Sequence, residues 1–356
     1  MKNLVFNTAA KDGKSKCHWM HVGKPNVNCS APRVHKEIME EVQSDTYLGD
    51  IVSNNGKNSL NISSRVSKGL GIISQIFNIL EQINFGTHFI EVGLLLRESM
   101  LINGILTNGE VWYNITKDDI KELDKVDLLY SQKLLKIPFS TPREAIFLEL
   151  GIQPIESILR KRRLNFLYYL IKRDQNSMLF KFFMAQYHNP SPGDWCMQIN
   201  EDLKDTEISM SFAEIQSITK YKFTKLVKEQ VTKFTLKVLL ESKDKHSKMK
   251  NVNYEKLKIQ PYFIKDSIST HDARNIFRYR TRMLNFKENY KGNNNDDICP
   301  LCKKHTDDQN KIESCTVLKE NINDLNKCRL LYTDTTNEEA IEILSKVMDI
   351  RNNILT

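Results

Sequence analysis

The residues best suited to hold a metal ion lie near the C-terminal end of the chain. Cys299 and Cys302 belong to a C-P-L-C motif, and Cys315 follows after twelve further residues. Two thiolates on a tight turn can reach one tetrahedral zinc ion, each at about 2.3 Å. A fourth ligand is less obvious, with His305 and Cys328 as candidates. The predicted zinc ligands are Cys299, Cys302, Cys315 and His305. The alternative is a degenerate site that packs without metal.

A second group of residues has the chemistry to contact phosphate. Residues 158–173 contain six basic side chains and no acidic one, and their apolar stripe would leave the basic side chains facing outward. In residues 270–286, arginines recur at every fourth position, which places them on one helix face. Guanidinium groups suit bidentate contacts with phosphate. The predicted nucleic-acid-binding residues are Arg160, Lys161, Arg163, Arg274, Arg278 and Arg282. A solvated or ion-paired face is the alternative.

The charge of the chain is unevenly distributed. Its 52 basic and 44 acidic residues give a formal net charge of +8. Residues 219–291 hold 19 Lys and Arg against 7 Asp and Glu, a net of +12, so the rest of the chain is net negative. A basic region on a mildly acidic body favours a polyanionic partner such as nucleic acid.

Composition and motif content narrow the classes of function. No apolar run approaches the roughly eighteen residues of a membrane span, and the N-terminal residues lack the apolar stretch of a signal peptide. We therefore expect an intracellular protein, in the nucleus or cytoplasm, whose seven cysteines are reduced or metal-bound. The chain has no Ser/His/Asp set, no glycine loop that cradles phosphate and no His-Glu-x-x-His motif, which disfavours an independent enzyme.

Helix signals are clearest in residues 97–151, where three helices are expected. The first should end at Asn108-Gly109, a common helix stop. Thr116 and Asp119 form the two halves of a capping box at the start of the second. Apolar residues then recur at intervals of three or four: Ile120, Leu123, Val126, Tyr130, Leu134 and Ile137. The third helix begins near a proline and should end at Gly151.

The other elements expected to position these groups are also mostly helical. Helical periodicity covers residues 63–80, 87–106, 154–186, 194–203, 220–238 and 270–286. Two short β-like runs, at 16–22 and 47–52, flank a helical candidate near 34–42. Such a start is typical of the end of a larger α+β domain, because so few strands make no full core. The sequence therefore predicts a mainly α fold.

Six pieces of the chain, in this order, resemble the C-terminal part of a reverse transcriptase from a non-LTR (LINE-like) retrotransposon, an RNA-directed DNA polymerase. They are K-S-K-C-H-W-M-H-V-G-K at 14–24, Y-L-G-D-I-V-S at 47–53, G-I-L-T-N-G-E-V-W-Y-N-I-T at 104–116, L-E-L-G-I-Q-P-I at 148–155, R-R-L-N-F-L-Y-Y-L at 162–170 and C-P-L-C at 299–302. The resemblance implies that the first two pieces close the polymerase palm. It further implies a helical thumb that grips the primer–template duplex, and a zinc knuckle near the C-terminus.

With the resemblance, the predicted fold is a helical, thumb-like bundle with a small α+β palm remnant at the N-terminus and a small zinc-knuckle-like tail. The expected domains follow the chain in order. They are an incomplete palm end at 1–60, a thumb-like domain at 61–190, a basic helical region at 191–292 and the tail with a C-terminal helix at 293–356. The partners that the resemblance implies are RNA or an RNA–DNA duplex and the N-terminal polymerase and endonuclease part, with no membrane.

Two departures from the family's pattern change the expected activity. The aromatic-x-Asp-Asp motif, whose aspartates hold two magnesium ions in the parent polymerase, should lie upstream of Lys14, and the Asp-Asp pairs at 118, 296 and 307 do not replace it. A histidine that relatives place four residues before the last cysteine is Lys311 here, which is a poor zinc ligand. We therefore expect a truncated, nucleic-acid-binding fragment that is inactive alone, with an incomplete zinc ligand set. A helical protein-interaction scaffold without a nucleic-acid role is the alternative.

Overall fold

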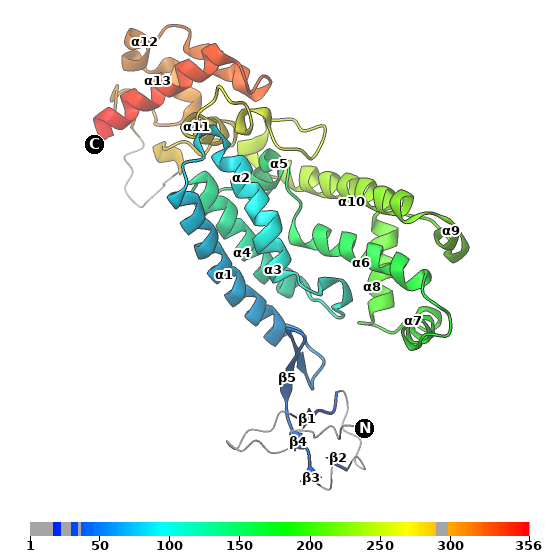
Figure 1. Ribbon diagram of the computed structural model, residues 1–356. Helices are drawn as coiled ribbons and strands as arrows, with labels where there is room; N and C mark the ends of the chain where they lie inside the picture. The colour runs from blue at the N-terminus through cyan, green and yellow to red at the C-terminus, as the bar shows by residue number, and fades with distance from the viewer. Residues whose placement is uncertain (1–16, 23–29, 35–36, 290–297, 356) are drawn as a thin grey trace. The chain divides into compact units, whose positions relative to one another are not determined.

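The computed structural model describes residues 17–22, 30–34, 37–289 and 298–355 of the chain (Figure 1). This part is mainly helical, with a few short strands near the N-terminus, which confirms the predicted fold class. Two compact units divide it. The first comprises residues 1–71, 103–124 and 159–224, and the second residues 72–102, 125–158 and 225–356. Because both units are discontinuous in sequence, they do not coincide with the four consecutive parts expected from the sequence, which remain a prediction.

Among the described residues, the N-terminal strands belong to the first unit and form three two-stranded sheets. β1 (His18–Trp19) pairs in parallel with β4 (Glu40–Glu41), β2 (Arg33–Val34) pairs antiparallel with β3 (Glu37–Ile38), and β5 (Ser44–Tyr47) pairs antiparallel with β6 (Asp50–Ser53). The helix expected near residues 34–42 is wrong. Of its described residues, Val34 lies in β2, residues 37–38 in β3 and residues 40–41 in β4, so their backbone groups pair across strands and not along a helix.

The remaining elements of the first unit are helical. They are η3 (Gly109–Val111), α3 (Asn103–Ile105), α7 (Met178–His188), α8 (Trp195–Asp205) and α9 (Phe212–Ser217), with residues 59–71 of α1 (Ser59–Gln82), 117–124 of α4 (Lys117–Leu135), 159–171 of α6 (Ile155–Ile171) and 220–224 of α10 (Lys220–Lys243). Aromatic rings fill the core around α8. Trp195 meets Phe166 edge-on at 5.8 Å between centroids and Phe183 at 6.4 Å. Tyr168 stacks on Phe223 at 5.2 Å.

The second unit holds the rest of these long helices and most of the C-terminal elements. They are η1 (Gly86–His88), α2 (Phe89–Leu96), a π-helical turn (Arg97–Ile102), α5 (Arg143–Leu150), η4 (Ser247–Met249), η5 (Pro261–Phe263), α11 (Thr270–Arg280), η6 (Lys287–Asn289), η7 (Gln309–Ser314), α12 (Thr316–Asn321), η8 (Leu325–Tyr332) and α13 (Glu338–Leu355). α2 and α4 approach closely at Gly93, where a Cβ atom would lie 2.4 Å from Leu134. Tyr130 donates a 2.5 Å hydrogen bond to the carbonyl oxygen of Gly93 and fixes the same contact.

The helix boundaries show which sequence signals are reliable. Asn108 ends the first segment with a positive φ of 59°, and the Thr116–Asp119 capping box forms as expected, with the Asp119 amide 3.1 Å from the Thr116 hydroxyl. Gly151 ends α5 with a φ of 64°. The expected single helix over residues 87–106 is instead interrupted by the π-helical turn between α2 and α3. α11 ends at Arg280, earlier than residue 286.

Candidate metal centre and basic surfaces

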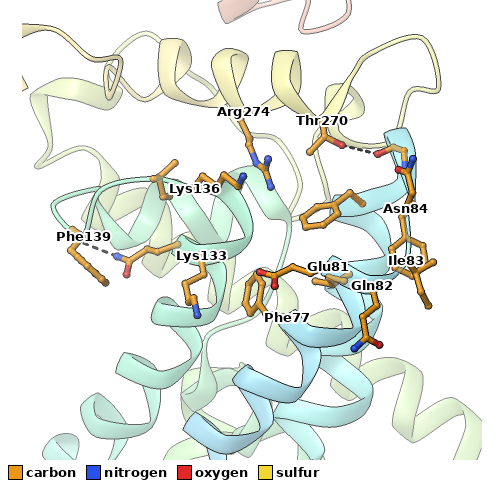
Figure 2. A pocket seen from close by; sticks show the side chains of 16 residues that line it. Phe77, Glu81, Gln82, Ile83, Asn84, Lys133, Lys136, Phe139, Thr270 and Arg274 are labelled. Atoms are coloured by element: carbon orange, nitrogen blue, oxygen red, sulfur yellow. Dashed lines mark hydrogen bonds between the residues drawn. The ribbon is translucent and has the colours of Figure 1, made fainter. Parts of the chain in front are cut away.

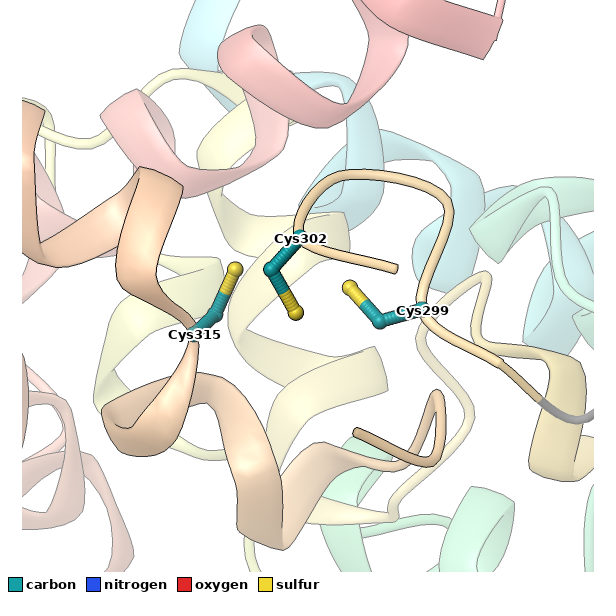
Figure 3. Close-up of side chains that lie close together, drawn as sticks. All are labelled: Cys299, Cys302 and Cys315. Atoms are coloured by element: carbon teal, nitrogen blue, oxygen red, sulfur yellow. The ribbon is translucent and has the colours of Figure 1, made fainter. Parts of the chain in front are cut away.

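The three predicted thiol ligands lie together in the second unit. Cys299, Cys302 and Cys315 are all buried, and their sulfur atoms lie within 4.8 Å of one another (Figure 3). These distances allow one metal ion to contact all three thiolates. The structure therefore brings together three of the four predicted metal ligands in a group that can hold a metal ion.

Backbone hydrogen bonds shape the loop that carries the first two cysteines. The amide of Cys299 donates to the carbonyl of His305 at 2.7 Å, and the amide of Lys303 donates back to the carbonyl of Cys299 at 3.0 Å. Lys303 takes a positive φ of 55°, which closes the loop in a tight turn. Cys315 lies directly before α12 and comes to the same place from another segment. A turn that presents two thiols, with a third from a following helix, is the arrangement expected of a knuckle.

The local environment favours the thiolate at one cysteine and the thiol at another. Burial raises the pKa of Cys302, but the amides of Lys304 and His305 and the neighbouring thiols stabilise its thiolate and bring that pKa to about 7. At Cys315, burial and the nearby charge of Cys299 raise the pKa to about 11. A divalent ion would lower both values, because metal ligation requires the deprotonated sulfur.

The fourth ligand position is less well filled. His305 lines the same small cavity as the three cysteines, yet it is not part of the group whose ligand atoms all lie within 4.8 Å. Lys311 also lines this cavity. Cys328 is buried in η8 with a pKa raised by burial to about 12, and it belongs to no metal-ligand group among the described residues. His305 is thus better placed than Cys328 to complete the set.

The Asp-Asp pairs in the described residues have structural roles. The Asp119 carboxylate completes the capping box of α4 by accepting a 3.0 Å hydrogen bond from the Thr116 amide, and Asp118 pairs with Lys121 at 2.9 Å. Asp307 is buried and binds Arg351 of α13 through two hydrogen bonds of 2.9 and 3.0 Å, and the Arg351 guanidinium stacks on Phe286 at 3.8 Å. Asp308 caps η7. The pair at 296 lies outside the described residues. Within the described residues, these partners leave the pairs in no arrangement typical of a two-metal polymerase site.

Two of the residues predicted to contact phosphate are buried, contrary to the expectation that they face outward. Arg160 and Arg163 are 4% and 3% exposed, and both bind Asp202 of α8. The Asp202 carboxylate accepts hydrogen bonds from Arg160 Nε at 2.9 Å and from Arg163 Nε at 2.7 Å. Asp205 accepts a further bond from Arg160 at 2.7 Å. A buried carboxylate here neutralises the arginines, so helix periodicity assigned them to the wrong face. Lys161 between them is half-buried.

The arginines expected on one face of the helix after residue 270 have varied environments. Arg274 donates to the carbonyl of Leu134 at 2.9 Å, and Arg278 donates to the carbonyl of Lys136 at 2.5 Å. Arg282 lies beyond the end of α11, with a φ of 55°, and pairs with Glu288 at 3.2 Å. The three arginines therefore do not form one row on α11.

Exposed lysines on α10 form a basic surface. The positive net charge of residues 219–291 indicated that such a surface exists but did not show which residues form it. The exposed lysines of its second-unit part are Lys225, Lys228, Lys233 and Lys237, and the exposed acids of that part are Glu229 and Glu241. Lys225 pairs with Glu229 at 4.0 Å. The lysine content of this helix was a usable signal, because lysine is almost never buried without a partner.

Comparison of the chain with protein-family models, with curated proteins and with solved structures finds no match. Among the described residues, no helix is both long and apolar enough to cross a membrane.

Proposed function

We propose that this chain binds RNA or an RNA–DNA duplex, as the thumb-like and knuckle-bearing C-terminal part of a non-LTR retrotransposon reverse transcriptase. The exposed lysines of α10 are the observation that carries the proposal. Their charge is only partly balanced by the two exposed glutamates of that part of the helix, and exposed lysine side chains can follow a phosphate backbone. The six sequence pieces described above support the family assignment. The predicted polymerase and endonuclease part would supply the remaining domains.

The cysteine group supports a zinc ion as the cofactor of this region. Cys299, Cys302 and Cys315 would hold the ion, with His305 or a water molecule completing four ligands. A zinc ion held here would have a structural role, because Cys299 and Cys302 of the C-P-L-C turn and Cys315 before α12 would be its ligands. Magnesium would be the cofactor of the parent polymerase, and we expect no primer extension from this chain alone.

The binding proposal is tested by the salt dependence of affinity. Each lysine that neutralises a phosphate contributes about 0.9 to the slope of log affinity against log salt. If all four contact phosphates, replacing Lys225, Lys228, Lys233 and Lys237 by glutamine should lower the magnitude of that slope by about 3.6 for an RNA–DNA hybrid.

The matched control carries the same reduction of charge at exposed lysines elsewhere. These are Lys68, Lys117, Lys121 and Lys346. The control variant should keep the slope of the unmodified chain, measured by fluorescence anisotropy of a labelled hybrid. Equal slopes of log affinity against log salt for the two variants would show that the α10 lysines do not contact the hybrid. Absence of hybrid binding by the unmodified chain would overturn the proposed function.

One observation favours the scaffold alternative. On α7, Met178 is 68% exposed and Phe182 is 66% exposed, and with Leu179 they form an apolar face. Apolar faces of this kind are typical of protein interfaces. If the chain does not bind the hybrid but loses a protein partner on replacement of Phe182 by serine, the scaffold function is the better assignment.

A further inference from the structure

A cavity of about 780 Å³ in the second unit shares no lining residue with the cysteine group or with α10 (Figure 2). Its walls come from the end of α1, the adjoining segment up to α2, the end of α4 with the loop that follows, and the start of α11. The volume lies in the range of sites that bind small organic ligands. The cavity combines three cations with several phenylalanine rings, so both its size and its lining suit a ligand that is partly anionic and partly flat.

The cations are Lys133 and Lys136 at the end of α4 and Arg274 on α11. Glu81 is the acidic residue in the lining, and none of the ion pairs found among the described residues includes Lys133, Lys136 or Arg274. Burial, together with the positive charge of Arg278, lowers the pKa of Arg274 to about 10. This unbalanced positive charge is a cost to the folded protein that a bound anion would relieve.

The geometry of Arg274 leaves donors for a ligand. Its Nε and Nη2 atoms donate to the carbonyl oxygen of Leu134, at 3.3 and 2.9 Å. The guanidinium also lies 5.2 Å from the ring centre of Phe89. Figure 2 shows the side chain extending from α11 into the cavity. Because these contacts hold the group in place, it is preorganised to donate its remaining N–H groups to an anion.

Aromatic rings lie beside these cations. Phe139, on the loop after α4, is 77% exposed, which is unusual for so large an apolar side chain. Its carbonyl accepts from Gln132, so the loop that carries the ring is tied to α4. Phe77 lines the cavity on the α1 side, with the Lys133 ammonium 4.8 Å from its ring centre. An exposed ring next to a cluster of cations is the arrangement with which proteins stack a base and hold its phosphate.

We infer that this cavity binds one nucleotide, with the phosphate at Lys133, Lys136 and Arg274 and the base stacked on Phe139. This inference rests on the proposed function, because it takes the ligand to be nucleic acid and names the part of it that the cavity would hold. Free nucleotides and an unpaired nucleotide at the end of a strand share this chemistry. The α10 lysines contact a duplex backbone, whereas this cavity accommodates a base that is not paired.

The test uses the full chain and two probes. Adenosine 5′-monophosphate and inorganic phosphate are titrated by calorimetry. An RNA–DNA hybrid with one unpaired 2-aminopurine nucleotide at its 5′ end reports stacking by loss of fluorescence. We expect the monophosphate to bind at least about tenfold more tightly than phosphate, because stacking adds to the anion contact. Phe139→Ala should remove this advantage and the fluorescence quenching without changing the affinity for inorganic phosphate.

Each variant has a matched control. Phe182→Ala removes an exposed phenylalanine of α7, and Lys117→Gln with Lys121→Gln removes two charges from the other end of α4. Neither should change binding, whereas Lys133→Gln with Lys136→Gln should weaken both the monophosphate and phosphate about tenfold.

The outcomes separate this inference from the proposed function. Quenching of the unpaired base, relieved by excess monophosphate, identifies the strand end as the ligand. Binding of monophosphate without quenching identifies the free nucleotide. No binding of either probe, or equal binding by the Phe139→Ala variant, overturns the inference. Binding of a blunt hybrid by the same protein, and its salt slope, decide the proposed function independently.

Discussion

Replacement of Asp202 by asparagine should destabilise the first unit strongly. The Asp202 side chain is fully buried and receives three of the hydrogen bonds that Arg160 and Arg163 make, at 2.7 to 3.0 Å. Asparagine keeps the size of the side chain but removes its charge, so two buried guanidinium groups lose their common counterion. Removing one partner of a buried pair typically costs about 3–5 kcal/mol. We expect a loss of this size in the free energy of unfolding.

Asp205→Asn is the matched control for this prediction. Asp205 bonds to the same Arg160, but its side chain is 42% exposed, so solvent screens the interaction. Exposed ion pairs contribute at most about 1 kcal/mol. The two aspartates lie three residues apart on one helix, and Asp202 differs from Asp205 both in its burial and in its contact with a second arginine, Arg163.

The assay for Asp202 is urea unfolding followed by tryptophan fluorescence. Trp19, Trp112 and Trp195 all belong to the first unit, so their emission follows this unit and not the second. The midpoint should fall for Asp202→Asn and stay nearly constant for Asp205→Asn, with similar slopes. A loss below about 1 kcal/mol for Asp202→Asn would refute the reasoning, because it would mean that Arg160 and Arg163 do not depend on this carboxylate. They would then again be candidates for phosphate contacts.

Three further predictions concern the binding and metal sites. Replacing Arg274, Arg278 and Arg282 by glutamine should reduce the slope of log affinity against log salt for a hybrid by less than about three, the value expected if all three contacted phosphates, since Arg282 already pairs with Glu288. A reduction of about three would show that all three arginines contact phosphates. Cys302→Ser should abolish zinc uptake by metal-stripped protein, whereas Cys328→Ser should still bind about one zinc ion per chain. Equal zinc content in the two variants would contradict the assignment of Cys299, Cys302 and Cys315 as the zinc ligands. Purified protein with magnesium and a primed homopolymer template should give no primer extension above a buffer control, and extension would overturn the expectation that the chain is inactive alone.

Local signals in the sequence predicted the fold well. The Thr116–Asp119 capping box and the stop at Gly151 act within a few residues, so their partners are visible in the sequence itself. Gly151 has a second reason to be glycine, because a Cβ atom there would lie 2.0 Å from the backbone of Lys258. That contact joins residues more than a hundred positions apart, and no local pattern indicates it.

The candidate metal site was predicted for a similar reason. Two of its cysteines are three residues apart, so the spacing alone fixes their distance within one turn. The fourth ligand depends on how separate segments pack, and spacing left it open between His305 and Cys328. The structure favours His305, which lines the cavity of the cysteine group, and this distinction needed tertiary packing.

The predicted phosphate contacts failed where charge was assigned by helix face alone. The run 160–163 looks like a basic helix surface, but Asp202, about forty residues later, brings a carboxylate to two of these arginines. A run of basic residues in the sequence does not show which of them will pair with a buried carboxylate from another segment. An arginine is more prone than a lysine to this error, because its planar group can form several hydrogen bonds at once and so tolerates burial.

Buried pairs of an arginine and a carboxylate also occur in the second unit. Arg97 pairs with Asp127 at 2.6 Å, and Arg280 pairs with Glu149 at 2.9 Å; all four side chains are almost fully buried. Glu149 also accepts hydrogen bonds from Tyr254 at 2.6 Å and Tyr262 at 2.7 Å. Burial and the Glu149 charge raise the pKa of both tyrosines well above the ordinary value, so these hydroxyls stay protonated as donors.

These buried pairs change what the net charge means for binding. Each buried pair takes an arginine out of the surface charge that a polyanion could contact. It also takes out a carboxylate that would have repelled the polyanion. The charge left on the surface then depends on lysines, which remain exposed on α10 and at the cavity of Lys133 and Lys136. A polyanion would therefore meet mostly lysine on these surfaces. Because an ammonium group is a point charge without the planar fork of arginine, such contacts favour binding that follows the phosphate backbone over recognition of particular bases.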